Sequence, residues 1–488
     1  MNIIFRVDSS KEIGAGHSMR CYALAEEFLR NNHKVIFISN SQLDFVKQKL
    51  ESKNIIIEKI KKTDPIDEIE KVIKLLEKYK SDFLILDGYN FDYNYQKAIK
   101  EKNIKIVYIT DLKGKYYCDI LICPTPGLKP SDFKSPIKTK YFLGPQYVFL
   151  RDEILKCKSV IKRKQKTNIK NILVSFGAGV LKIIVIKNII GIIENNFSNC
   201  LIKILIGSKE NKKIIQKILP QNLNNKYELL LPKEVKTDVF KNIDLAFSTA
   251  STTLWELLYL KIPTFCYYTN INQKKNAEWL NNNKYVINLG NLKKYKINKT
   301  KKIFNYKNII NFCNKKELLS HLTKNKIYLE LISNILNLKF RKATSKDCKF
   351  IWSLRNDENI RYWSFNNNFI SFKEHIIWYK KKLKDKNSII FILLKNKNKV
   401  GYIRYDIKKN NAEINIAIRK GYHGKHIGSN GLKLTGEYIK NNYKIKKLIA
   451  RIKNENIASI KCFEKAGYIL ERKNNNYLVM IFKIGDLI

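Results

Sequence analysis

The sequence lacks the features that mark disulfide-rich, metal-binding and membrane-spanning proteins. Its nine cysteines lie far apart with no C-x-x-C spacing, so we expect buried reduced thiols rather than a disulfide framework. The six histidines form no ligand cluster with acidic partners, which argues against a zinc site, and we expect no metal. The most apolar stretch, residues 180–193, is interrupted by Lys182 and Lys187 and is too short and too charged to span a bilayer.

We expect no secretion signal at the start of this sequence, and we find no internal repeat in it. Arg6 and Asp8 would lie inside the apolar core that a signal peptide needs, so this segment is interpreted as a strand. Together with the expected reduced thiols, this favours a cytoplasmic protein without a membrane partner.

Acidic residues are scarce: 43 Asp and Glu stand against 93 Lys and Arg, for a formal net charge of +50. Such a charge is compatible with nucleic acid or an anionic membrane as a partner. The lysines, however, are scattered through almost every segment and form no single stripe or tail, so we interpret the charge as a drift of composition and expect no nucleic-acid partner. The positive field would still attract anionic small substrates.

The length and the residue pattern predict three domains. A chain of 488 residues exceeds the roughly 250–300 residues that one hydrophobic core serves. Short β-branched runs alternate with helical patterns over 1–155 and again over 168–330, which predicts βαβ units with parallel sheets, and the basic stretch 156–170 is interpreted as a linker. Over 338–488 an antiparallel meander and helices indicate a separate α+β domain.

The first predicted strand, residues 2–7, runs through a Gly-x-Gly turn into a helix. Such a turn brings backbone N–H groups and the positive end of the helix close to an anion, for example a sugar-nucleotide phosphate, although a plain tight turn is the alternative. His17 lies in the first helical turn, where the helix dipole disfavours its charged form and keeps the imidazole able to act as a base near neutral pH. We predict that Arg6, Asp8 and Arg20 gather around the same turn.

These residues carry a resemblance to a known family. The run Phe5-Arg6-Val7-Asp8, followed by Gly14-Ala15-Gly16-His17-Ser18-Met19-Arg20-Cys21, resembles the start of the UDP-2,4-diacetamido-2,4,6-trideoxy-β-L-altropyranose hydrolases of pseudaminic acid biosynthesis. The resemblance covers roughly the first two thirds of the chain. It implies two Rossmann-like domains of the GT-B kind and makes His17 the catalytic residue; a turn histidine satisfied by the backbone is the alternative.

Further positions of the first two domains match the same family. Asp87 and Tyr89 lie at the end of an apolar strand, and Gly88 stands where the family usually has histidine. Asp111 follows a second apolar strand. Asp87 and Asp111 are each either a substrate ligand or a helix N-cap. The segment 144–151 resembles the interdomain crossing and is interpreted as structural. The resemblance implies a substrate site made of Arg6, Asp8, Gly16, Arg20, Asp87, Tyr89, Ser251, Thr252, Thr253, Glu256, Asn272 and Gln273.

The uridine diphosphate part of that site is expected at the turn after the strand 245–247. Small hydroxyl residues there let backbone amides approach phosphate, which Thr252 and Thr253 would hold, and Glu256 could accept both ribose hydroxyls. Ser251 replaces the usual glycine, and the loop 177–180 departs from the Gly-Gly-x-Asp of the family. A helix N-cap with an apolar face is the structural alternative.

The third domain carries a different pattern. The strand 412–418, the basic turn from Arg419 and the helix from Ser429 resemble the acetyl-CoA loop of the GNAT N-acetyltransferases, as does the Asn454 to Tyr468 segment. The resemblance implies an acetyl-CoA site made of Ile416, Ile418, His423, Gly424, Lys425, His426, Ile427, Gly428, Asn456 and Phe463. Phe463 stands where many members carry the tyrosine that protonates the leaving thiolate, so water or another group must act there.

The region around Arg355 and Trp363 resembles acetyltransferases that act on a 4-amino sugar of the same pathway, and both residues are expected to line the acceptor pocket; the alternative is a core role for the aromatic residues. The resemblances together imply a bifunctional enzyme that acetylates a UDP-linked 4-amino sugar with acetyl-CoA and hydrolyses the product to UDP and free sugar. The alternatives are a GT-B glycosyltransferase fused to a protein N-acetyltransferase, and a nucleic-acid-binding protein suggested only by the charge.

Overall fold

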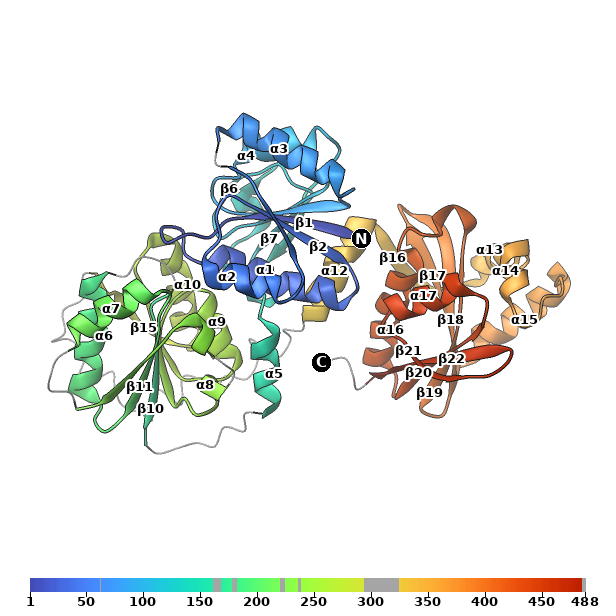
Figure 1. Cartoon of the computed structure of the whole chain (residues 1–488). Helices are drawn as coiled ribbons and strands as arrows, with labels where there is room; N and C mark the ends of the chain where they lie inside the picture. Colours follow the sequence, from blue (N-terminus) through green and yellow to red (C-terminus); the bar gives the residue numbers. More distant parts are fainter. Residues whose placement is uncertain are drawn as a thin grey trace. The chain divides into compact units, whose positions relative to one another are not determined.

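The computed structural model describes residues 1–61, 63–160, 168–177, 182–219, 224–235, 238–293 and 324–484. The chain divides into two compact units, Met1–Lys324 and Asn325–Ile488, shown in Figure 1. Within the described ranges, no helix combines the length and the apolar character that crossing a bilayer requires.

The first sheet of the N-terminal unit is parallel and has the order β3-β2-β1-β4-β5-β7-β9. Its strands are β1 (Asn2–Val7), β2 (Lys34–Ser39), β3 (Ile56–Lys59), β4 (Phe83–Asp87), β5 (Ile106–Ile109), β7 (Ile120–Cys123) and β9 (Lys140–Leu143). Its helices are α1 (Gly16–Arg30), α2 (Asp44–Glu51), α3 (Pro65–Lys78) and α4 (Tyr93–Lys100). Two short strands, β6 (Gly114–Lys115) and β8 (Phe133–Lys134), pair beside it.

Side chains that alternate along β1 explain how helices cover both faces of this sheet. Ile4 packs with Val72 of α3 and Ile99 of α4, whereas the next residue, Phe5, packs against Phe28 of α1. Figure 1 shows α3 and α4 on the face opposite α1 and α2. Because successive strand residues point to opposite faces, this parity also decides where the polar residues of β1 go.

The second sheet of the same unit is also parallel, in the order β12-β11-β10-β13-β14-β15. Its elements are β10 (Asn171–Ser175), α6 (Ile183–Asn196), β11 (Leu201–Leu205), α7 (Lys209–Ile218), β12 (Lys226–Leu230), α8 (Asp238–Lys241), β13 (Leu245–Thr249), α9 (Thr252–Tyr259), β14 (Thr264–Tyr268), α10 (Ile271–Asn282) and β15 (Ile287–Asn291). Ile172 and Val174 pack with α6 and α7, while Leu173 packs with α9 and α10.

The predicted parallel sheets are thus confirmed, and in both of them the strand order reverses beside the first strand, which is where doubly wound sheets bind ligands. Helix α5 (Asp152–Val160) enters the stretch 156–170 that was predicted as a linker, so helix replaces part of it. Residues 161–167 of that stretch lie outside the described residues, as do 178–180 of the loop 177–180.

The C-terminal unit has a mixed seven-stranded sheet in the order β16-β17-β18-β19-β20-β22-β21. Its elements are α12 (Lys324–Leu336), β16 (Leu338–Lys342), α13 (Cys348–Arg355), α14 (Glu358–Trp363), α15 (Phe372–Lys384), β17 (Ser388–Lys395), β18 (Asn398–Lys408), β19 (Asn411–Ile418), α16 (Ile427–Asn442), β20 (Lys447–Lys453), α17 (Ile457–Lys465), β21 (Ile469–Lys473) and β22 (Tyr477–Lys483). One face packs against α16 and α17, and the other against α13 and α15. Antiparallel strands followed by helices agree with the predicted α+β domain.

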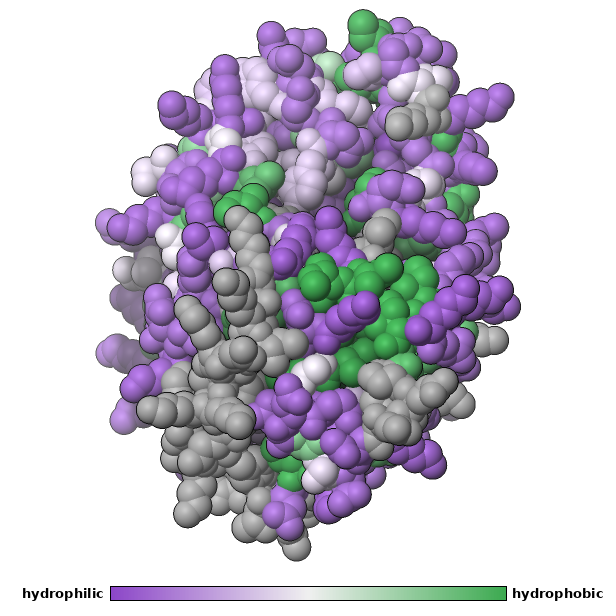
Figure 2. Space-filling view, turned by 90° about the vertical axis from the view of Figure 1, so that its left-hand side faces the viewer, coloured by the Kyte–Doolittle hydropathy of each residue, from purple (hydrophilic) through white to green (hydrophobic). Residues whose placement is uncertain are grey.

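Figure 2 shows one face of the molecule, where hydrophilic residues spread over most of the surface without forming a single stripe. An apolar area lies among them.

Candidate functional site

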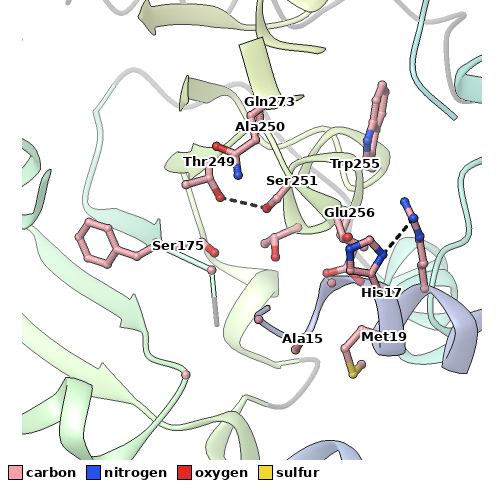
Figure 3. A pocket seen from close by; sticks show the side chains of 18 of the residues that line it. Ala15, His17, Met19, Ser175, Thr249, Ala250, Ser251, Trp255, Glu256 and Gln273 are labelled. Atoms are coloured by element: carbon pink, nitrogen blue, oxygen red, sulfur yellow. Dashed lines mark hydrogen bonds between the residues drawn. The ribbon is translucent and has the colours of Figure 1, made fainter. Parts of the chain in front are cut away.

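A cavity of about 820 Å³ opens in the N-terminal unit and is lined from both parallel sheets. The first sheet supplies the turn after β1 and the start of α1, including His17. The second supplies the turn after β13 and the start of α9, including Thr252. Figure 3 shows Ala15, His17 and Met19 on one side of this cavity and Ser251, Glu256 and Gln273 around the remainder.

Two helix N-termini meet at the cavity. A Cβ atom built on Gly16, the first residue of α1, would lie 3.8 Å from the Oγ1 of Thr252, the first residue of α9. Neither helix has an acidic residue in its first turn, and neither N-cap side chain accepts a hydrogen bond from the helix. The positive ends of both helices are therefore left uncompensated, which suits a bound anion such as a diphosphate.

The imidazole of His17 is oriented by a carboxylate. Its Nδ1 lies 2.6 Å from Oδ1 of Asp87 and 3.2 Å from Nη2 of Arg20. The contact with Asp87 is the shorter, and because an ionised carboxylate only accepts hydrogen bonds, we assign the proton to Nδ1. This leaves Nε2 with the lone pair of a base. The ring of Tyr89 packs edge-on against the imidazole, with centroids 4.9 Å apart. The structure thus adds a tautomer-fixing partner to the helix dipole that the sequence predicts.

Asp87 in turn is held by Arg20, which also binds Asp111. Nε and Nη2 of Arg20 donate to the two oxygens of Asp87 at 2.5 and 2.6 Å, and Nη1 donates to both oxygens of Asp111 at 2.8 Å. Burial raises the pKa of Asp87, but Arg20 and His17 outweigh it and hold the pKa below its ordinary value. Burial lowers the pKa of Arg20, yet Asp111 and Asp87 hold it well above its ordinary value. The Arg20–Asp87 pair therefore stays charged at neutral pH.

Arg6, Asp8 and Asp87, which were predicted to bind substrate, are not among the residues that line the cavity. Arg6 is fully buried and pairs with Asp8 at 2.7 Å and with Glu68 of α3 at 2.9 Å. Asp8 accepts hydrogen bonds from the hydroxyl of Ser39, at the end of β2, and from the backbone N–H of Asn40. The reason is strand parity, because Arg6 shares the α3 face with Ile4 and points away from α1.

The turn after β13 keeps its predicted place. Thr249 and Ser251 share a hydrogen bond of 2.9 Å between their hydroxyls, drawn in Figure 3, and Ser251 is the N-cap of α9. Thr252 and Thr253 form the first turn of α9 and line the cavity. Gln273 also lines it and accepts a hydrogen bond from the backbone N–H of Thr269 at 3.1 Å. The side chain of Asn272 lies outside the described residues.

Glu256 lies one turn into α9, where the sequence places a ribose ligand, and its partner is Arg151. Nε and Nη2 of Arg151 donate to its two carboxylate oxygens at 2.6 and 2.7 Å. Burial lowers the pKa of Arg151, but Glu256 and Glu153 outweigh this and raise it above its ordinary value. The sequence assigned Arg151 only to a structural crossing, since nothing in its neighbourhood indicates a partner 105 residues away.

Among the described residues, no group of three or more His, Cys, Asp or Glu side chains could hold a metal ion. The wall of the cavity also includes apolar side chains of Phe176, Ile206 and Trp255. A polar end with two helix N-termini and a partly apolar wall suit a ligand that joins an anionic group to a ring.

In the C-terminal unit, β19 and β20 separate after a short stretch of pairing. Their parallel register covers only Asn411, Ala412 and Glu413 of β19, so Ile416 and Ile418 lie on the part of the strand that has left β20. A strand edge of this kind can bind the amide groups of an extended ligand. The edge leads directly into the turn before α16.

That turn adopts the backbone conformation of a glycine-rich loop. Gly424 and His426 have φ values of 73° and 58°, so His426 occupies a left-handed position in which glycine costs least. A Cβ on Gly428 would lie 2.8 Å from Sγ of Cys462, which explains why no side chain fits there. Ile427 is buried at the first position of α16, which has no acidic residue in its first turn. The turn thus offers an anion site at a helix N-terminus.

Two other predicted acetyl-CoA ligands fold back on the turn. His423 Nε2 donates to the carbonyl of Ile418 at 2.7 Å, and Lys425 Nζ donates to the carbonyl of Gly421 at 2.9 Å. Both side chains stabilise the loop, and the Lys425 ammonium still adds positive charge at its rim.

The remaining predicted residues of this unit have structural partners. Asn456 caps α17 by accepting from the backbone N–H of Ser459 at 3.0 Å. Phe463 is buried and packs edge-on against Tyr468. Arg355 donates to the carbonyl of Asn366, and burial together with the charges of nearby arginines lowers its pKa.

Trp363 ends α14 and packs edge-on against the ring of Tyr362, with centroids 4.7 Å apart.

Comparisons with known proteins give one relative over nearly the whole chain and others over only one part of it. Residues 337–469 match the family model described as "Acetyltransferase (GNAT) domain". A protein of Methanocaldococcus jannaschii named "Uncharacterized protein MJ1062" is 28% identical, with 97% of this chain and 98% of that protein covered. The "UDP-2,4-diacetamido-2,4,6-trideoxy-beta-L-altropyranose hydrolase" of Campylobacter jejuni is 25% identical and covers 57% of this chain and 96% of its own length.

Among solved structures, a domain from Methanocaldococcus jannaschii is 28% identical and covers 30% of this chain and 97% of its own, with a TM-score of 0.27. A spermidine N-acetyltransferase from Vibrio cholerae in complex with CoA and spermine is 22% identical over 31% of this chain and 97% of its own, with a TM-score of 0.29. The family match and the fold confirm the predicted domain: the C-terminal part of the chain contains a GNAT acetyltransferase domain.

Proposed function

We propose that the chain is a bifunctional enzyme of pseudaminic acid biosynthesis. The GNAT domain would acetylate the 4-amino group of a UDP-linked amino sugar with acetyl-CoA. The N-terminal unit, with two Rossmann-like domains of the GT-B kind, would hydrolyse UDP-2,4-diacetamido-2,4,6-trideoxy-β-L-altropyranose to UDP and the free sugar. The observation that carries the hydrolase proposal is the convergence on one cavity of an oriented imidazole, His17, and the N-terminus of α9 at Thr252.

The hydrolysis step follows from this geometry. The amides and hydroxyls of Thr252 and Thr253, with Gly16 opposite, would hold the diphosphate, and Glu256 would accept the ribose hydroxyls. Water attacks the anomeric carbon, the bond from this carbon to the phosphate oxygen breaks, and its electron pair leaves with UDP. The water proton passes to Nε2 of His17, and Asp87 stabilises the imidazolium that forms. Tyr89 and Gln273 line the space for the remainder of the substrate.

The acetyl transfer uses the strand edge and the turn before α16. Acetyl-CoA would lie along Ile416 and Ile418, with its pyrophosphate at the turn that ends at Gly428. The amine of the sugar attacks the thioester carbonyl, a C–N bond replaces the C–S bond, and the amine proton is lost while the thiolate gains one. Phe463 cannot supply that proton, so water or another group must. Arg355 and Trp363 would line the acceptor side.

The pairing of these activities has a physical rationale. Consecutive reactions on one chain raise the effective concentration of the shared intermediate. The similarity to MJ1062 extends over 97% of this chain, so both parts occur together in that relative. We expect the enzyme to act in the cytoplasm, where nucleotide sugars and acetyl-CoA are available.

The test supplies the purified chain with the UDP-4-amino sugar and acetyl-CoA and follows CoA and UDP release separately. His17→Ala should abolish UDP release and leave CoA release intact. Loss of both activities, or of neither, would contradict the division of labour. UDP release that requires an added sugar or lipid acceptor would instead indicate a glycosyltransferase.

A further inference from the structure

His17 belongs to a buried network of side chains, of which the proposed hydrolysis uses only His17 and Asp87. Four side chains take part: His17 and Arg20 from α1, Asp87 at the end of β4 and Asp111 after β5. We propose that Arg20 is a positioning residue, which locks the carboxylate that orients His17 and sets the charge against which His17 takes up its proton. The inference rests on the proposed hydrolase function.

The geometry of Arg20 fixes the rotation of Asp87. Two nitrogens of the guanidinium donate to the two oxygens of the carboxylate at 2.5 and 2.6 Å, in the paired arrangement that only arginine offers. Oδ1 of Asp87 accepts from both Arg20 and His17, so a rotation of the carboxylate would break both contacts at once. The thiol of Cys21 lies 3.4 Å from Oδ2 and adds a weak donor. Asp87 is completely buried, so solvent cannot replace a lost partner.

Arg20 also decides the net charge of the network. With a neutral imidazole, one guanidinium and two carboxylates carry a net charge of −1, and a proton on His17 brings this to zero. Since these groups are buried or half-buried, their charges are screened less than in water. If Arg20 were absent, the positive charge that forms on the imidazole during the reaction would face two uncompensated carboxylates.

The other groups that surround His17 are the same residues in every Arg20 variant. Tyr89 packs against the imidazole from the turn after β4, and the positive end of α1 acts on it from its own helix. On the opposite sheet, Glu256 and Arg151 neutralise each other. A shift in the pH dependence of an Arg20 variant thus reports the network itself.

A purely structural ion pair makes a different prediction. If Arg20 only stabilised the fold, its loss would lower stability without moving the pH dependence. Arg30 provides a matched control, because it lies on the same helix and also joins two carboxylates, Glu27 and Asp152, yet does not line the cavity.

The experiment measures the pH profile of UDP release from UDP-2,4-diacetamido-2,4,6-trideoxy-β-L-altropyranose by the full chain. For Arg20→Gln we expect kcat to fall by about 10- to 100-fold, as a misplaced catalytic group does, and the acid limb to move up by about one pH unit. Arg20→Lys keeps the charge without the paired hydrogen bonds, so its acid limb should stay while kcat falls. Asp111→Asn, which removes one negative charge, should move the acid limb down. Arg30→Gln should match the unaltered chain.

Titration calorimetry with UDP checks that each variant retains a folded cavity. If Arg20→Gln does not fold, the kcat of Arg20→Lys tests the positioning role in its place. An unshifted acid limb in Arg20→Gln, or a kcat for Arg20→Lys equal to that of Arg30→Gln, would overturn the positioning role while the hydrolase function stands. Absence of UDP release by the unaltered chain would overturn the hydrolase function and this inference with it.

Discussion

The Arg151–Glu256 pair allows a quantitative test of how the cavity is built. The Glu256 side chain is only 3% exposed and that of Arg151 17%. Both carboxylate oxygens of Glu256 accept from Arg151, at 2.6 and 2.7 Å. Replacing Arg151 with methionine keeps much of the packing volume but leaves a buried carboxylate without its counter-charge.

The expected magnitude follows from that burial. Removal of one partner from a buried ion pair costs about 3–5 kcal/mol, because the other charge stays desolvated. Since Arg151 retains some contact with solvent, Arg151→Met should cost about 3 kcal/mol of the unfolding free energy. Glu256 would also lose its orientation toward the ribose, so UDP affinity should fall by about 10-fold, equivalent to about 1.4 kcal/mol.

The assay combines denaturant unfolding, followed by circular dichroism, with UDP titration calorimetry. Arg151→Met, Glu256→Gln and the double variant form a cycle, in which we expect a coupling of about 1–3 kcal/mol. Lys47→Gln is the control, because its pair with Glu51 is exposed and should contribute at most about 1 kcal/mol. A loss in Arg151→Met no larger than in the control, or strictly additive single variants, would refute the reasoning.

Three further predictions concern the C-terminal unit. Gly428→Ala should lower stability by about 1–3 kcal/mol and weaken acetyl-CoA binding measured by calorimetry, because its Cβ would lie 2.8 Å from Cys462 Sγ, and adding Cys462→Ala should restore both. Asn456→Ala should cost about 1 kcal/mol of unfolding free energy as a lost N-cap, and Asn456→Ser should regain most of it; an equal loss in both would contradict the capping role. Burial raises the pKa of Asp347, but Arg341 and Lys399 outweigh it and leave the pKa lowered, so its stabilisation should be present above about pH 4 and fade as the pH falls. The difference in unfolding free energy between the unaltered chain and Asp347→Asn should therefore shrink in acid, and a constant difference would contradict the assignment.

Much of the fold could be predicted from the sequence, because many of the parallel strands are short β-branched runs that a following helix buries on one face. The strand 2–7 was predicted with the observed bounds. The strand β9 was missed, since Lys140–Leu143 contains no β-branched residue.

The site was harder to predict, because a position at the end of a strand does not say which neighbour takes the side chain. Asp87 was predicted as a substrate ligand, but the sequence does not show that His17 and Arg20 of α1, about 70 residues earlier in the chain, contact it. Successive residues of a strand point to opposite faces, so Arg6 points away from α1 if its neighbour Phe5 points toward it. This alternation could have corrected the prediction for Arg6. Arg151 carried no local signal, because its partner Glu256 lies 105 residues further along the chain.

The helix N-termini show that an uncompensated helix end does not make an anion site by itself. The helices α3, α7 and α15 carry acidic residues in their first turn, which stabilise a helix by about 0.3–1 kcal/mol each. The helices α1, α9 and α16 have neither such a residue nor a side-chain cap, but the same holds for α6 and α10. The scattered lysines draw anions to the protein from all sides. A diphosphate would therefore be held where an uncompensated end also coincides with a close backbone approach, as at Gly16 of α1 opposite Thr252 of α9 and at the tight turn that ends at Gly428.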